Sequence, residues 1–224
     1  MTDPIRLGML LFPKITQLDL TGPFEVLARL PGARISLLWR SLEPVTSGTG
    51  LTIQPTLTFA EAPKFDVLVV PGGAGIVPLL QDREVLGFLR QQAQTARYLT
   101  AVCTGSLLLG AAGLLEGYEA TTHWAYHELL PLCGAKAVKQ RVVVDRNRIT
   151  GGGVTAGIDF ALRLVAELSD EDTARAIQLG LEYDPDPPFR AGTPTLAGDA
   201  ITARVRRSFE PSRAEYEAQL LRRS

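Results

Sequence analysis

The feature that most constrains the fold is a series of short apolar runs, each followed by a stretch of helical composition. The runs are short and flanked by Gly and Pro, which is typical of buried strands. The four clearest span residues 5–12, 34–39, 67–70 and 98–102. Helical patterns, such as that over residues 155–168, alternate with them. This alternation predicts an α/β fold with a mostly parallel central sheet and helices on both of its faces.

Capping residues predict where two of the helices begin. Thr21 is expected to cap the helix after the first strand, with Pro23 in its first turn, where a missing N–H costs nothing. Ser169 is expected to cap a later helix, with Asp172 three residues on as in a capping box.

The composition of the chain changes near residue 185. Residues 184–198 are rich in Pro and Gly, and residues 200–221 are charged and helical in composition. We therefore predict one α/β domain over residues 1–185. Residues 186–224 are expected to form a linker and a C-terminal helical tail that is not a separate domain.

Charge and composition exclude several classes of protein. With 23 Lys and Arg against 24 Asp and Glu, the chain lacks the basic footprint of a nucleic-acid-binding protein, so no such partner is expected. The apolar runs fall short of the ~20 residues that a membrane helix needs. The N-terminus carries no signal-peptide pattern, and two cysteines make no disulfide framework. We expect a cytoplasmic protein with free thiols and no membrane partner.

Cys103 is the residue with the most chemical promise. It lies where a predicted strand runs into Thr104 and Gly105 and then a helix, the arrangement of a nucleophile elbow. The helix N-terminus behind it is expected to favour the reactive thiolate. The alternative is that Cys103 is a small buried hydrophobe, as free cysteines often are. Cys133 has no helix start behind it and is interpreted as a packing residue.

Asp19 and the small residues at strand ends are further candidates. Asp19 lies between two leucines just after the first strand, where it is either a general acid and base with a pKa raised by burial or a helix cap. Backbone N–H groups of Gly73 and Thr104 are candidate donors to developing negative charge, and Gly72 belongs to the same turn. The alternative for these residues is that they only make tight turns.

The histidines and a glycine run suggest other chemistry that fits less well. His123 and His127 have the i, i+4 spacing of metal ligands, but no third ligand is evident, so no metal is expected. One of them is a possible base for Cys103, or both are structural. Gly151 to Gly153 lack a nucleotide-binding fingerprint, so no cofactor is expected and close packing explains them.

Six segments together resemble the ThiJ/PfpI superfamily over roughly residues 5–183, and most closely its bacterial isocyanide hydratase branch. They occur in family order and are specific only in combination. The segments are Leu18-Asp-Leu-Thr-Gly-Pro23, Pro71-Gly-Gly-Ala-Gly75, Ala101-Val-Cys-Thr-Gly-Ser106, Ala120-Thr-Thr-His-Trp124, Thr150-Gly-Gly-Gly-Val-Thr-Ala-Gly-Ile-Asp159 and Leu181-Glu-Tyr-Asp-Pro185.

The resemblance implies a flavodoxin-like α/β sandwich, usually a homodimer. It also implies hydration of an isocyanide, R–N≡C, to an N-substituted formamide without metal or organic cofactor. Carried onto this chain, Cys103 is the nucleophile that forms a thioimidate, Asp19 is the acid and base beside it, and Thr104 supports the site. Gly72 and Gly73 are then expected to bind the substrate or an oxyanion.

Departures from other branches narrow the function but leave alternatives. Thr104 stands where peptidase-like members have His, and Asp19 stands where the stress-protein and glyoxalase-like members have Glu. AraC-type regulators share the Thr-Thr-His-Trp segment, but only about 40 residues follow Tyr183, too few for their DNA-binding domain. Another thiol enzyme, glyoxalase-like or amidase-like, and a non-catalytic sensor whose Cys103 oxidises remain alternatives.

Overall fold

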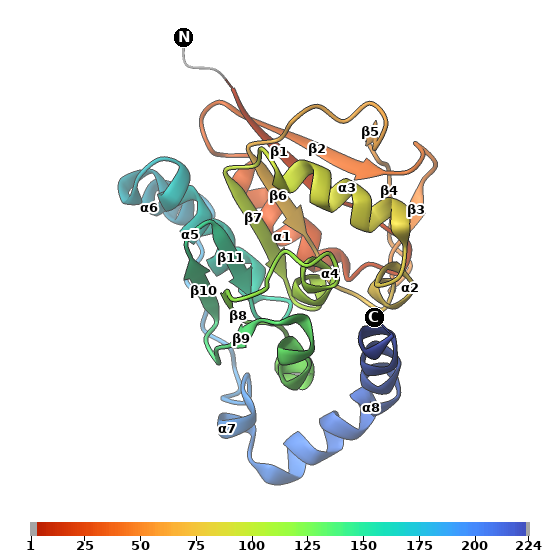
Figure 1. Ribbon diagram of the computed structural model, residues 1–224. Helices are drawn as coiled ribbons and strands as arrows, with labels where there is room; N and C mark the ends of the chain where they lie inside the picture. Colours follow the sequence, from red (N-terminus) through yellow and green to blue (C-terminus); the bar gives the residue numbers. More distant parts are fainter. Residues whose placement is uncertain (1–3, 223–224) are drawn as a thin grey trace.

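A computed structural model describes residues 4–222 and contains a seven-stranded central sheet (Figure 1). Six of its strands are parallel, and β10 at one edge is antiparallel to β11. The strand order is β10-β11-β7-β6-β1-β2-β5. The strands are β1 (Ile5–Leu10), β2 (Ala33–Trp39), β5 (Leu57–Thr58), β6 (Val67–Val70), β7 (Tyr98–Val102), β10 (Val142–Asp145) and β11 (Arg148–Gly151). Two small pairs lie outside the sheet: β3 (Val45–Thr46) with β4 (Thr52–Ile53), and β8 (Glu119–Ala120) with β9 (Lys136–Ala137).

Helices cover both faces of the sheet. α1 packs against α5 on one side, and α3 packs against α4 on the other (Figure 1). The helices are α1 (Gln17–Leu27), α2 (Ile76–Leu79), α3 (Arg83–Ala93), α4 (Gly105–Ala111), the 3₁₀ helix η1 (Trp124–Cys133), α5 (Ala156–Leu168), α6 (Glu171–Gly180), α7 (Pro194–Ala197) and α8 (Asp199–Leu221).

Coverage of both faces explains why the central strands read as continuous apolar runs. Every residue of β6 is buried, and four of the five residues of β7 are buried too. A strand in such a position gains stability from apolar side chains on both of its faces. The predicted α/β sandwich with a mostly parallel sheet is confirmed.

The predicted start of the first helix is wrong. α1 begins at Gln17 after Thr16, so Thr21 lies inside the helix, where its hydroxyl donates to the Gln17 side chain at 2.8 Å. Pro23 is also inside the helix, and its ring packs on Gly157 of α5, where an added Cβ would lie 3.1 Å from the ring. Tight contact between two helices therefore places a proline where local preference disfavours it.

The predicted cap of α6 is wrong by one residue. Asp170 caps α6, with its side chain accepting the Thr173 N–H at 2.7 Å. Ser169 instead ends α5. Both residue types are good caps, and the chain direction at the end of α5 selects between them.

The C-terminal helix α8 packs back onto the sheet domain against η1 and α2 (Figure 1). Ser212 and Tyr126 share a hydrogen bond of 2.6 Å, and Arg213 pairs with Glu128 at 2.8 Å. Only Tyr216 and Leu220 are buried among the described residues of α8. Within residues 4–222, no helix is long and apolar enough to span a membrane.

Close packing of α4 on β6 generates a stability prediction. A Cβ at Gly105 would overlap the carbonyl oxygen of Val70, so Gly105→Ala is expected to lower the free energy of unfolding by about 2–3 kcal/mol. Gly87→Ala is the matched control, since Gly87 is exposed in the middle of α3 with nothing within 4 Å of an added Cβ. The control is expected to raise the free energy of unfolding by up to about 1 kcal/mol. Urea denaturation measures both, and equal effects would contradict the packing argument.

Candidate active site

Cys103 lies in a strained turn between β7 and α4. Its φ of 56° is in the left-handed region, which disfavours a residue with a side chain. Its N–H donates to the carbonyl oxygens of Gly152 at 2.9 Å and Gly151 at 3.1 Å. Its own carbonyl accepts the Thr122 hydroxyl at 2.7 Å. These bonds hold the backbone in the sharp turn predicted from the sequence. Cys103 is buried there, with 6% of the residue exposed.

Asp19 is fully buried and does not cap its own helix. It lies in the first turn of α1, but its Oδ2 accepts the N–H of Gly72 at 3.0 Å, across 53 residues of sequence. Its Oδ1 has no hydrogen bond to oxygen or nitrogen of the described chain. Burial raises the pKa of Asp19 to about 7, although hydrogen bonds from the Cys103 thiol and Gly72 lower it in part. The alternative interpretation of Asp19 as a helix cap is wrong.

Ionisation of the Cys103 thiol is also disfavoured. Burial raises its pKa well above the ordinary value, and the negative charge of Asp19 adds to the shift. Hydrogen bonds from the backbone N–H groups of Thr104 and Val154 lower the pKa, but not enough to outweigh burial. The predicted effect of the helix start is present in the Thr104 N–H, but burial outweighs it and the thiol is favoured over the thiolate. Burial opposes the ionisation of both groups, and the Asp19 carboxyl loses its proton at a lower pH than the thiol does.

Gly72 and Gly73 organise the site through backbone groups that are already bonded. The Gly72 N–H donates to Asp19, and the Gly73 N–H donates to Thr104 Oγ1 at 3.0 Å. A Cβ at Gly72 would lie 2.6 Å from the Thr104 nitrogen, so only glycine permits this approach. The expected use of the Gly73 N–H as a free donor to substrate does not fit this geometry. The N–H groups directed at the thiol are those of Thr104 and Val154.

Neither histidine is bonded to the reacting pair in the described part of the chain. His123 accepts the Ala125 N–H at 3.3 Å on Nδ1, and burial lowers its pKa to about 4. It contacts Gly153, where an added Cβ would lie 2.7 Å from its ring. His127 is buried, and its Nε2 has no hydrogen bond to the described chain. Among residues 4–222, no group of three or more His, Cys, Asp or Glu gathers as a metal site.

Two residues near the reacting pair were not predicted from the sequence. Val154 contributes only a backbone N–H, which any residue carries, so no side-chain signal marks it. Tyr216 of α8 is 1% exposed and lies with its hydroxyl 3.0 Å from Thr104 Oγ1. A tyrosine in a charged helix was its only signal. Cys133 is buried against Gly110, which agrees with its interpretation as a packing residue.

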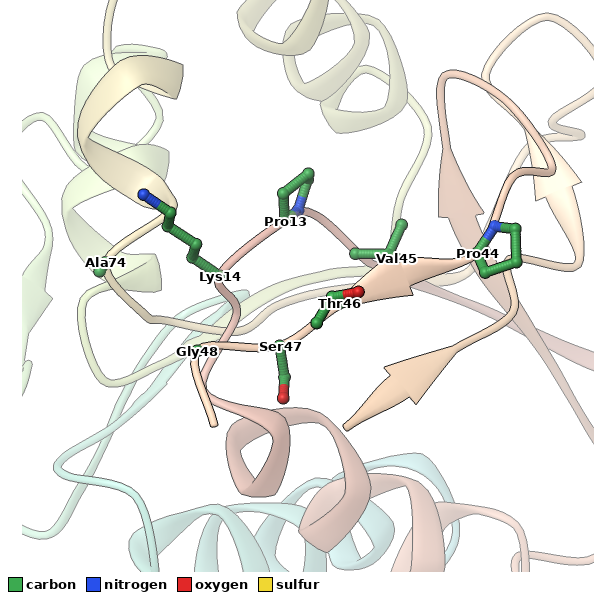
Figure 2. A pocket seen from close by; sticks show the side chains of 8 residues that line it. All are labelled: Pro13, Lys14, Pro44, Val45, Thr46, Ser47, Gly48 and Ala74. Atoms are coloured by element: carbon green, nitrogen blue, oxygen red, sulfur yellow. The ribbon is translucent and has the colours of Figure 1, made fainter. Parts of the chain in front are cut away.

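A surface hollow of about 640 Å³ lies beside the loop that follows β1 (Figure 2). Pro13 and Lys14 line it from that loop, and Val45 and Thr46 line it from β3. Neither Asp19 nor Cys103 lines it. It therefore gives no direct access to the thiol.

The raised pKa of Asp19 predicts a pH-dependent change in stability. The pKa of Asp19 rises from 3.8 to about 7 on folding. The contribution of Asp19 to the free energy of unfolding is therefore most favourable below pH 3.8, and it is lost as the pH rises through about 7. Asp19→Asn has no such loss. Its free energy of unfolding relative to wild type is expected to increase by roughly 4 kcal/mol between pH 4 and pH 8. Urea denaturation at several pH values measures this difference, and a constant difference would contradict the assignment.

Comparisons with known proteins place the chain in a family. The sequence model of the DJ-1/PfpI family matches residues 6–167. An isonitrile hydratase from Pseudomonas putida is 58% identical over 93% of this chain and 91% of its own length. A crystal structure of a ThiJ/PfpI family protein from Pseudomonas syringae has a TM-score of 0.95 at 45% identity, covering 98% of this chain and 91% of that one. The transcriptional regulator GbdR of Pseudomonas aeruginosa is 36% identical, but the match covers only 52% of its length. The chain therefore belongs to the DJ-1/PfpI family.

Proposed function

We propose that this protein hydrates an isocyanide, R–N≡C, to an N-substituted formamide, with Cys103 as nucleophile and Asp19 as proton carrier. The observation that carries the proposal is the burial of the Asp19 carboxyl beside the Cys103 thiol, with no histidine bonded to either group in residues 4–222. The 58% identity to the Pseudomonas putida isonitrile hydratase supports the substrate class.

The restricted exposure of the thiol suits this substrate. The isocyano group is linear, and its electrophilic carbon is at the tip. It reaches the thiol of the buried Cys103 more easily than a branched carbonyl carbon does. Asp19 is fully buried next to the thiol, so a proton passes between the two groups without solvent.

The first half of the reaction forms a covalent intermediate. The Asp19 carboxylate takes the proton of the Cys103 thiol, and the thiolate attacks the terminal carbon of the isocyanide. Asp19 then gives the proton to that carbon, which yields a thioimidate, R–N=CH–S–Cys103. Backbone N–H groups of Thr104 and Val154 stabilise the thiolate while it exists.

The second half of the reaction releases the product. Asp19, again a carboxylate, takes a proton from water as the water oxygen adds to the thioimidate carbon, and it returns that proton to nitrogen. Loss of the sulfur leaves R–NH–CHO, and the hydroxyl proton returns to the Cys103–Asp19 pair. The balance is one isocyanide and one water to one formamide, with no metal or organic cofactor consumed.

We further propose a cytoplasmic homodimer. A reducing compartment suits a nucleophile that must remain a free thiol. The exposed apolar side chains Leu179 and Phe189, which are 82% and 79% exposed, supply apolar area for a partner copy. Light scattering after size exclusion measures the assembly.

The covalent step predicts the behaviour of cysteine variants. Cys103→Ala is expected to form no formamide from an aryl isocyanide, because the thioimidate cannot form. Cys133→Ala is the matched control, and it is expected to retain activity because Cys133 packs on Gly110 away from the reacting pair. Product formation is followed by chromatography. Turnover by Cys103→Ala would overturn the mechanism, and turnover of methylglyoxal in place of the isocyanide would favour a glyoxalase-like enzyme.

The raised pKa of Asp19 predicts how the rate of the reaction depends on pH. In the free enzyme, kcat/KM is expected to rise with pH through about 7, as Asp19 loses the proton that prevents it from acting as a base. Asp19→Asn is expected to lower kcat about 10²- to 10⁴-fold, the usual contribution of a positioned acid and base. Initial rates from pH 5 to pH 9 test both expectations. A wild-type profile that stays flat down to pH 5 would remove Asp19 from proton transfer.

A further inference from the structure

We propose that Tyr216, carried into the site by the C-terminal helix α8, is a positioning residue for the hydration reaction. It acts by holding Thr104 and the Gly72–Gly73 turn in place, and it does not touch the reacting atoms. The proposal rests on the proposed function for its kinetic consequence. The geometry that carries it is independent of which substrate the enzyme uses.

Three hydrogen bonds join Tyr216, Thr104 and Gly73 in a closed ring. The Tyr216 hydroxyl lies 2.7 Å from the Gly73 carbonyl oxygen and 3.0 Å from Thr104 Oγ1, and the Gly73 N–H donates to the same Oγ1 at 3.0 Å. The phenolic hydroxyl is the donor to both acceptors, with the shorter contact to the Gly73 carbonyl oxygen. Thr104 Oγ1 accepts from Tyr216 and from the Gly73 N–H.

This ring fixes both polar groups of Gly73. Its N–H and its carbonyl are each held by a side chain, while the preceding Gly72 carbonyl accepts the Thr16 N–H at 2.9 Å. The Gly72 N–H is thereby directed at Asp19, whose Oδ2 it reaches at 3.0 Å. Tyr216 is thus linked to Asp19 through the Gly72–Gly73 turn.

The same ring also determines what Thr104 does. Thr104 Oγ1 accepts two hydrogen bonds, one from the Tyr216 hydroxyl and one from the Gly73 N–H, and these hold its side chain in one rotamer. A fixed side chain in turn steadies the Thr104 backbone, whose N–H is directed at the Cys103 thiol.

A purely structural anchor would not need the hydroxyl. Tyr216 is 1% exposed, and its ring packs against Tyr126 at a centroid distance of 5.0 Å, which a phenylalanine ring reproduces. Other bonds already secure α8, including Gln81 to the Gln219 carbonyl at 2.6 Å. In Figure 1 the helix runs along the lower side of the domain and ends beside α2. It lies beyond residues 6–167, so the family pattern does not supply this hydroxyl.

Tyr216→Phe tests the proposal by removing the hydroxyl alone. We expect kcat to fall about 5- to 50-fold with KM within about twofold, the effect of one buried hydrogen bond on a positioned group. The acid limb of the pH profile should move to higher pH, because a loosened Gly72 N–H lowers the pKa of Asp19 less. Unchanged kcat and unchanged pH profile in a folded variant would overturn the proposal.

Ser212→Ala is the matched control. It removes the hydrogen bond between α8 and Tyr126, one turn from Tyr216, and leaves the ring intact. It should lower thermal stability as much as Tyr216→Phe without moving the pH profile. Equal shifts in both variants would mean that α8 acts only as a support.

Two further measurements keep the test decisive. Thr104→Val opens the same ring, so adding Tyr216→Phe to it should cause little further loss, and full additivity would overturn the proposed linkage. If Tyr216→Phe does not fold, the pH shift is sought in Thr104→Val alone, and its absence there overturns the proposal.

Alkylation of Cys103 by iodoacetamide, measured as a function of pH, reports on the thiol and the Asp19 carboxyl without any isocyanide. A shifted alkylation profile in a protein that turns over no isocyanide supports Tyr216 and rejects the proposed function.

Discussion

The burial of two acidic side chains next to each other is the constraint on which the site depends. Asp19 is fully buried and Cys103 nearly so, and burial raises the pKa of each. Water would let both groups ionise near their ordinary pKa values, but the interior does not solvate two anions side by side. The thiol therefore stays protonated until the neighbouring carboxylate takes its proton. In the proposed hydration Asp19 acts as base, then as acid, then as base again.

The backbone around the pair explains how such a costly arrangement persists. The left-handed φ of Cys103 and the burial of Asp19 each cost a few kcal/mol of folding free energy. The Cys103 N–H donates to Gly151 and Gly152, its carbonyl accepts from Thr122, and all three partners are buried. Asp19 accepts one N–H from Gly72, and hydrogen bonds from Gly72 and the Cys103 thiol offset part of the cost of its burial. The strain is thus confined to the site, and the fully packed sheet offsets it.

The sequence predictions were right where the physical cause lies within a short stretch of the chain, and wrong where it depends on a distant contact. The central strands β6 and β7 were predicted because a strand buried on both faces is mostly apolar, and β6 matches its predicted span of 67–70. The turn at Cys103 was predicted because a strand end, a small residue and a helix start are adjacent in the chain. The start of α1 was missed because Pro23 sits in the helix only by packing on Gly157, which lies far along the sequence.

The sequence by itself determined the sheet and the strand-to-helix turn that carries Cys103. The family resemblance of the sequence also implied that Asp19 lies beside Cys103. Only the tertiary structure decided the direction of the thiol pKa, since desolvation depends on everything packed around the sulfur and outweighs the helix N-terminus. It also decided that the N–H groups of Gly72 and Gly73 serve Asp19 and Thr104 instead of standing free. Tyr216 reaches Gly73 across 143 residues, and no local pattern encodes a hydrogen bond between segments that meet only when α8 folds back.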